Sequence, residues 1–256
     1  MADPVAPPPL WTRFAGGAAD PRVVLLCLPF AGGGALAYRT WARALGPDGV
    51  AVWPVQLPGR EDRFEEDAYE DLPALVSTLL AEFGPRLDGR PYALFGHSMG
   101  GGIALELARE ARRRGMPEPV RMFLSASRPP NRPDPDAPRY DLPRDRFVEQ
   151  LRKYDATSVL LDRPDLLEVF LPKLRADFAL VERHRYRSEP PLACPFTVLG
   201  GLDDGAVPPN VLPAWADYTS GGTEVRLVGG PHFFLESARD VVLKVIRTRL
   251  ESVAAA

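Results

Sequence analysis

Lysine, histidine and cysteine are scarce in this chain of 256 residues, and no excess of basic charge occurs. Acidic residues number 34 against 31 basic ones, a formal net charge of -3. This balance argues against a nucleic-acid-binding protein, whose surface would carry a basic patch. No apolar stretch approaches the roughly 18 residues of a membrane span, and no secretion signal is recognised at the N-terminus. With two cysteines, we expect a reduced cytoplasmic protein that contacts neither nucleic acid nor membrane.

Short apolar runs alternate with amphipathic stretches along most of the chain. The runs cover residues 23–28, 50–55, 92–95, 121–126, 196–199 and 225–228. They are continuously apolar, which is typical of strands covered on both faces. Helical patterns separate them, at about residues 36–46, 69–83, 99–115, 209–219 and 235–250. The alternation predicts an α/β fold with a mostly parallel, doubly wound sheet.

The alternation of apolar runs and helical patterns is interrupted once, between residues 128 and 190. This segment opens with a proline-rich stretch and continues with helical patterns, one of them interrupted by Pro172. We expect residues 128–190 to form a helical lid insertion over the carboxyl edge of the sheet, where ligands bind in open α/β folds. The core of the α/β fold is then formed by residues 21–127 and 191–256, with a loose N-terminal arm at residues 1–20.

The strongest motif is the pentapeptide GHSMG at residues 96–100, centred on Ser98. It follows an apolar run and precedes a strong helical pattern, the strand–turn–helix context of a nucleophile elbow. Glycine at both ends suits a turn in which side chains would collide. We therefore predict that Ser98 is a catalytic nucleophile. The alternative is a glycine-rich strand-to-helix turn whose serine has no catalytic role.

A serine hydroxyl needs an adjacent base, and the chain has three histidines. His97 neighbours Ser98 but should point elsewhere, and His184 should be solvated among the arginines of the lid. His232 follows the last strand and is the predicted base. The orienting acid should follow the strand at 196–199, where Asp203 and Asp204 compete. We favour Asp204, because the chain order Ser98, Asp204, His232 resembles that of the α/β-hydrolase fold, in which a carboxylate followed by x-x-Val-Pro recurs.

Two backbone N–H groups should form the oxyanion hole. Met99, at the start of the helix, should supply one. The loop after the first core strand should supply the other; we expect Phe30 to be this donor, with its neighbour Ala31 as the alternative. The three histidines lack metal-ligand spacing, so we expect no metal, and no nucleotide fingerprint calls for a cofactor.

The chain resembles the type II thioesterases, the stand-alone thioesterases of polyketide synthase and nonribosomal peptide synthetase pathways. The resemblance covers about residues 22–249. Its most specific parts are LPFAGG at 28–33, QLPGR at 56–60 and LRADF at 174–178, beside the more widespread GHSMGG at 96–101. One departure is Gly205, where family members commonly carry proline.

The resemblance implies an enzyme that hydrolyses acyl or aminoacyl thioesters from the phosphopantetheine arm of acyl or peptidyl carrier proteins, removing stalled units. It also implies a monomer without a cofactor of its own. Two arginine sets could steer an acidic carrier: Arg109, Arg112, Arg113 and Arg114, or the lid set Arg183, Arg185 and Arg187, which we favour. The alternatives are a serine esterase for small free esters, a product-releasing or cyclising thioesterase, and a non-catalytic binding protein.

Overall fold

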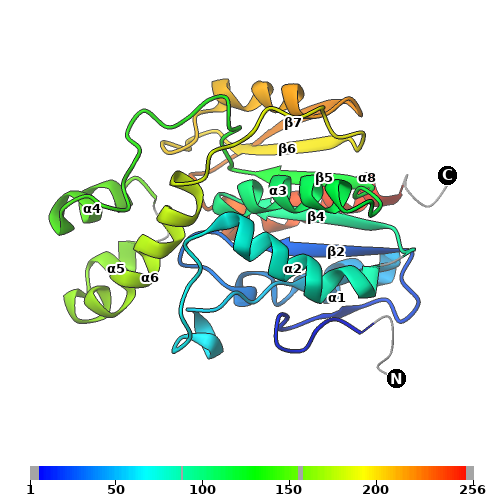
Figure 1. Cartoon of the computed structure of the whole chain (residues 1–256), viewed down its shortest axis with the longest axis horizontal. Helices are drawn as coiled ribbons and strands as arrows, with labels where there is room; N and C mark the ends of the chain where they lie inside the picture. Colours follow the sequence, from blue (N-terminus) through cyan, green and yellow to red (C-terminus); the bar gives the residue numbers. More distant parts are fainter. Residues whose placement is uncertain (1–5, 88, 155–157, 252–256) are drawn as a thin grey trace.

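A single seven-stranded sheet organises the computed structural model, which describes residues 6–87, 89–154 and 158–251 (Figure 1). Its strand order is β1-β3-β2-β4-β5-β6-β7. All neighbouring pairs are parallel except β1 and β3. The strands are β1 (Gly16–Gly17), β2 (Val23–Leu28), β3 (Val50–Pro54), β4 (Tyr92–His97), β5 (Arg121–Ser125), β6 (Phe196–Gly201) and β7 (Thr223–Val228). The predicted mostly parallel sheet is confirmed, and the short antiparallel β1 was not anticipated.

Helices cover both faces of the sheet. One face packs against α2 (Leu72–Leu87) and α3 (Met99–Arg113), and the other against α1 (Trp41–Leu45) and α8 (Arg239–Glu251). Strand β2 shows why: Leu26 belongs to the first apolar cluster and Leu25 to the second, and both are completely buried. Each such side chain contributes about 1.5–3 kcal/mol through burial. The continuously apolar runs therefore indicated sandwiched strands correctly for β2 to β6.

Within the described residues, three α-helices lie between β5 and β6 and sit together beyond one end of the sheet (Figure 1). They are α4 (Arg144–Leu151), α5 (Ser158–Leu161) and α6 (Pro164–Glu182). Their apolar side chains form a separate buried cluster that includes Phe147, Leu174 and Phe178. Helix α6 continues through Pro172 despite the missing N–H group. We use the word lid for residues 128–190.

Three regions differ from the sequence-based expectations. Residues Pro209–Tyr218 form a 3-10 helix instead of an α-helix. Strand β7 is an edge strand with partly exposed residues. The predicted arm is attached to the core, since β1 pairs with β3 and Trp11 is buried. Among the described helices, none is long and apolar enough to cross a membrane.

Candidate active site

Ser98 lies at the sharp junction between β4 and α3. Its backbone has φ +53° and ψ −115°, an unusual conformation for a residue with a side chain. Such geometry costs of order 1–3 kcal/mol and persists where the surroundings impose it. Here the Ser98 N–H donates to the carbonyl oxygen of Ser125 at 2.8 Å, which ties the turn to the neighbouring strand β5.

The two glycines of the motif permit this turn by their lack of a side chain. A Cβ atom on Gly96 would stand 2.1 Å from the carbonyl oxygen of Gly100. A Cβ atom on Gly100 would stand 2.4 Å from the carbonyl oxygen of Leu28. Both contacts are with backbone, which cannot move aside locally. The motif therefore encodes a close approach of β2, β4 and α3, as a nucleophile elbow requires.

The loop after β6 holds a buried carboxylate–imidazole pair. Asp204 Oδ2 is 2.9 Å from His232 Nδ1, and both side chains are almost completely buried. The other carboxylate oxygen, Oδ1, accepts the N–H groups of Ala206 at 2.9 Å and Val207 at 2.8 Å. Asp203, in contrast, is exposed. Of the two aspartates that the sequence left open, Asp204 is the one that contacts His232.

The opposite nitrogen of the same ring, Nε2 of His232, is buried and makes no hydrogen bond within the described residues. The ring lies edge-on to Tyr154 at 4.8 Å between centroids and to His97 at 5.4 Å. Burial raises the pKa of the Tyr154 phenol to about 12, so this ring stays neutral at physiological pH. His232 is thus oriented by Asp204 on one side and enclosed by aromatic rings on the other.

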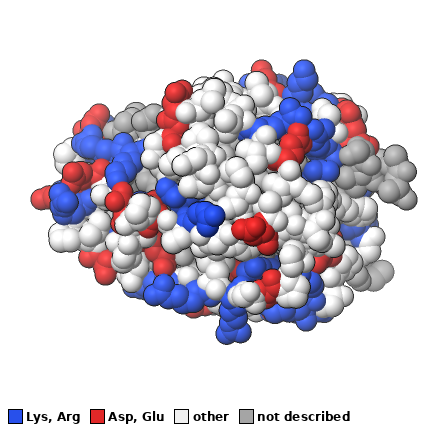
Figure 2. Space-filling view, turned by 90° about the horizontal axis from the view of Figure 1, so that it is seen from above, with Lys and Arg blue, Asp and Glu red and all other residues white. Residues whose placement is uncertain are grey.

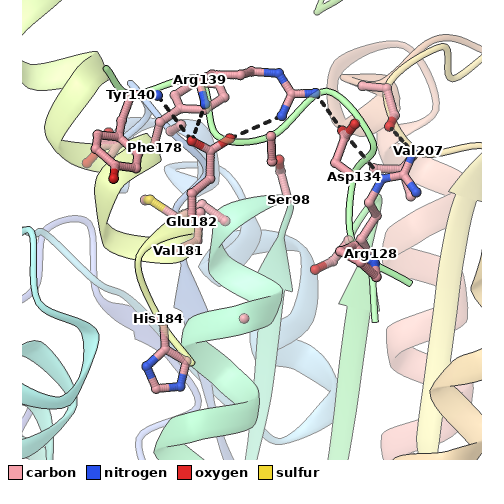
Figure 3. Close-up of a pocket in the computed structure, with 18 of the residues that line it drawn as sticks. Ser98, Arg128, Asp134, Arg139, Tyr140, Phe178, Val181, Glu182, His184 and Val207 are labelled. Carbon is pink, nitrogen blue, oxygen red and sulfur yellow. Dashed lines mark hydrogen bonds and ion pairs between the residues drawn. The ribbon is translucent and has the colours of Figure 1, made fainter. Parts of the chain in front are cut away.

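Ser98 opens onto a cavity of about 720 Å³ beneath the lid. Figure 3 shows the Ser98 side chain at the elbow, pointing toward the lid segment that carries Arg139. Tyr154 and Phe233, which both pack on the His232 ring, line the same cavity. Ser98 therefore opens onto a cavity that is also lined by two residues packed on the His232 ring.

Two of the three residues considered for the oxyanion hole, Ala31 and Met99, also line this cavity. The Phe30 ring packs instead against Phe233, with 4.8 Å between centroids. Within the described part of the chain, the backbone N–H groups of Phe30 and Ala31 donate no hydrogen bond. Both groups therefore remain available to a ligand.

A charged network forms one wall of the cavity (Figure 3). The Arg139 guanidinium donates to Asp134 at 2.6 Å and to Glu182 at 3.1 Å. Glu182 also accepts the backbone N–H groups of Arg139 at 2.6 Å and Tyr140 at 3.1 Å. Apolar side chains such as Phe178 and Val181 complete the lining. The chamber thus has mixed polarity.

The remaining histidines lie in aromatic or charged surroundings. His97 is completely buried and is not among the described residues that line the cavity, and its Nδ1 lies 3.0 Å from Ser125 Oγ. Complete burial holds its pKa well below the ordinary value, so the ring is neutral. The expectation that His184 is solvated is wrong. Its side chain is 11% exposed and lies 3.7 Å from Glu106, because the chain after α6 folds back onto α3.

The sheet topology and the serine elbow define an α/β-hydrolase. A model of the thioesterase domain matches residues 24–250, so the chain belongs to the thioesterase family. Among solved structures, it is similar to the type II thioesterase BorB from the borrelidin biosynthetic cluster, with 35% identity and a TM-score of 0.83. That match covers 94% of this chain and 98% of BorB.

Named relatives give the same family. The chain is 34% identical to thioesterase PikA5 of Streptomyces venezuelae, over 88% of this chain and 80% of that protein. It is 37% identical to LgrE of Brevibacillus parabrevis, over 96% of this chain and 94% of that protein. LgrE bears the name linear gramicidin dehydrogenase, but the residues matched here include the region that matches the thioesterase domain.

The sequence patterns predicted no role for Tyr154, Arg139 or Asp177 at this site. Tyr154 and Arg139 follow no motif, and only the folded lid brings them to the cavity. Asp177 carried a usable signal, since it is an acidic residue within an apolar helical stripe and is 1% exposed. A charge in such a position needs a buried partner.

Proposed function

We propose that this enzyme hydrolyses acyl or aminoacyl thioesters carried on the phosphopantetheine arm of carrier proteins, and so removes stalled units from polyketide or nonribosomal peptide assembly. The observation that carries the proposal is the buried Asp204–His232 hydrogen bond of 2.9 Å, next to Tyr154 and Phe233, which line the chamber onto which Ser98 opens. Membership of the thioesterase family and similarity to BorB, described as a type II thioesterase, support the substrate class.

In the proposed mechanism, Ser98 Oγ attacks the thioester carbonyl carbon while His232 Nε2 takes the hydroxyl proton. The Nδ1–H group donates to Asp204, which fixes the tautomer and stabilises the imidazolium that forms. The tetrahedral intermediate expels the pantetheine sulfur, which receives the proton from His232. A water molecule, deprotonated by His232, then attacks the acyl-serine ester and releases the free acid and Ser98.

Negative charge on the carbonyl oxygen must be met by N–H groups already in place. The N–H of Met99, at the first position of α3, is one proposed donor; it lies at the positive end of the helix dipole. The second is the N–H of Phe30 or Ala31. The position of Ala31 on the cavity wall supports it as a candidate beside Phe30.

The chamber supports acyl groups of modest size and mixed polarity. Its volume of about 720 Å³ is within the range of small-molecule sites. The ion-paired wall around Arg139 offers hydrogen-bonding groups, whereas Phe178 and Val181 offer apolar contact. Both surfaces suit short acyl and aminoacyl units better than a long unbranched alkyl chain.

The carrier protein is the proposed partner. The helix arginines are neutralised, since Arg112 pairs with Glu189, and Arg113 and Arg114 pair with Glu110. In the lid set, Arg183 pairs with Glu70, whereas Arg185 and Arg187 are exposed and make no ion pair within the described residues. Figure 2 shows the two charge signs interspersed over the lid end on the face it displays. We therefore favour Arg185 and Arg187 as the residues that attract the acidic carrier protein.

A monomer in the cytoplasm suffices for this proposal, because every proposed catalytic group comes from one chain. Cys27 and Cys194 are both free, buried thiols, as suits a reducing compartment.

The test is hydrolysis of a panel of acyl groups, each presented on carrier protein and as a free pantetheine thioester, by the wild type and by Ser98→Ala. We expect turnover by the wild type and a loss of about 10⁶-fold in the variant. Oxyester cleavage without thioester turnover would instead identify a serine esterase. Absence of fluorophosphonate labelling on folded protein would indicate a binding protein.

A further inference from the structure

A buried ion pair joins the lid to the segment after β3. Arg60 Nη2 lies 2.6 Å from Asp177 Oδ1, and Arg60 Nη1 lies 3.1 Å from Asp177 Oδ2. Asp177 belongs to α6 and is 1% exposed, and Arg60 is 6% exposed. The two residues come from the LRADF and QLPGR motifs, to which the proposed catalytic steps assign no role. A bidentate pair of this kind fixes the relative orientation of both side chains.

The same pair also forms hydrogen bonds with the loop at residues 29–34, which we call the oxyanion loop. Asp177 Oδ2 accepts the N–H of Gly32 at 2.7 Å. Arg60 Nη1 donates to the carbonyl oxygen of Gly33 at 3.1 Å. The carboxylate and the guanidinium thus hold the N–H and the carbonyl group of two adjacent glycines of the loop, each through a charge-assisted hydrogen bond.

Helix α6 also packs on this loop one turn before Asp177. Gly32 has φ +76°, and a Cβ atom there would stand 2.8 Å from Leu174 Cδ2. Leu174 and Asp177 are three residues apart, so they face the same side of the helix. Helix α6 therefore contacts the loop at Gly32, directly after Phe30 and Ala31, whose N–H groups are the proposed oxyanion donors.

Gln56 completes the support from the other side. Its Oε1 accepts the N–H of Ala35 at 3.0 Å, and its Nε2 donates to the carbonyl oxygen of Arg60 at 3.0 Å. Glycine-rich backbone has many accessible conformations, so such a loop needs restraint to keep a donor aimed at one point. The contacts supply that restraint from α6 and from the segment after β3.

We propose that Asp177 is a positioning residue, which holds the oxyanion loop in its donor geometry when the lid helix α6 is seated. The inference rests on the proposed function, because it assumes that the loop donates to the tetrahedral intermediate. It makes the lid a part of the catalytic apparatus: movement of α6 away from the core removes Asp177 from the Gly32 N–H and frees the loop.

Two ligands with the same acyl group separate this role from a merely structural one. An acyl trifluoromethyl ketone adds to Ser98 and forms a charged tetrahedral adduct, whereas a non-hydrolysable thioether analogue of the acyl-pantetheine only occupies the chamber. For Asp177→Asn and Asp177→Ala we expect kcat to fall about 10- to 100-fold. Ketone affinity should fall by a similar factor, and thioether affinity by less than about threefold.

Glu106→Gln is the matched control, because Glu106 forms a buried pair with Arg109 on α3 that does not contact the oxyanion loop. It should lower the melting temperature without selectively weakening the ketone. If neither Asp177 variant folds, Arg60→Lys takes their place, since it keeps the charge and loses the bidentate fork.

Unchanged kcat, or an equal loss of ketone and thioether affinity, would overturn the role of Asp177. Failure of the wild type to hydrolyse any thioester would overturn the proposed function instead. In that case the comparison of ketone and thioether affinities still tests the positioning role of Asp177, because ketone addition requires Ser98 and the oxyanion loop but no turnover of a thioester.

Discussion

The sheet core and the lid hold their residues in place by different means. In the core, strands β2 to β6 are covered on both faces, and the two large apolar clusters include most of the buried side chains. The lid has a small apolar cluster of its own, and polar contacts tie it to the core: Asp177 with Arg60, Arg183 with Glu70, and Lys173 with the carbonyl oxygen of Glu66.

The division has a functional consequence. Ser98, Asp204 and His232 all lie on core loops that end strands or begin helices, so their geometry depends on the rigid part of the molecule. The lid contributes Tyr154, Phe178 and Glu182 to the chamber wall. Substitutions in the core loops should therefore impair the chemical step. Most lid substitutions should instead change substrate choice, and Asp177 is the exception because it contacts the oxyanion loop.

The largest expected effect concerns the core carboxylate. Asp204→Asn should lower kcat by about 10⁴-fold, because an amide no longer holds the His232 tautomer that accepts the serine proton. The measurement is steady-state hydrolysis of an acyl-pantetheine thioester. Asp203→Asn is the matched control, since Asp203 is exposed, and it should retain wild-type activity. The reverse order of effects would assign the orienting role to Asp203.

The second comparison truncates one completely buried phenylalanine in each region. Phe123→Ala in β5 and Phe147→Ala in α4 remove the same group from sites of equal burial. Each should cost about 3–5 kcal/mol locally. Hydrogen exchange should show loss of protection throughout the sheet for Phe123→Ala, but a loss confined to the lid for Phe147→Ala. Equal loss in both variants would mean that lid and core unfold as one unit.

A third test concerns pH and the buried His97. The folded chain keeps this ring neutral, whereas the unfolded chain binds a proton there below pH about 6.5. The contribution of His97 is therefore present above that pH and is lost as the pH falls. The free energy of unfolding should decrease on acidification by up to about 1.4 kcal/mol per pH unit from this residue. Between roughly pH 7 and pH 5, a range that brackets this pKa, the free energy of unfolding measured with denaturant should fall less steeply on acidification for His97→Gln than for the wild type. Identical slopes in the two proteins would contradict this prediction.

The smallest expected effect is electrostatic. Arg185→Glu with Arg187→Glu should lower the ratio of kcat/KM for carrier-bound over free pantetheine substrate by about threefold at low salt. The difference should vanish at high ionic strength, because salt screens exposed charges. Arg113→Glu with Arg114→Glu is the control, since both arginines are already paired with Glu110. An unchanged ratio at every salt concentration would remove the lid arginines as a docking feature.

Local patterns predicted the parts of the fold that depend on local physics. Continuous apolar runs indicated β2 to β6, and the GHSMG pentapeptide indicated a turn that tolerates no side chain at Gly96 or Gly100. The failures have equally local causes. Two residues were too few to reveal β1, and the apolar spacing at 209–219 did not distinguish the observed 3-10 helix from an α-helix, because their periods of about 3.0 and 3.6 residues are similar.

The sequence by itself determined the fold class, the serine elbow and the histidine after the last strand, because these follow from side-chain size, backbone conformation and chain order. Only the tertiary structure distinguished Asp204 from Asp203, buried His184, brought Tyr154 onto His232 and joined Asp177 to the oxyanion loop. Each of these contacts joins residues far apart in the chain. Their distances depend on how the lid and the loops pack, which no local pattern encodes.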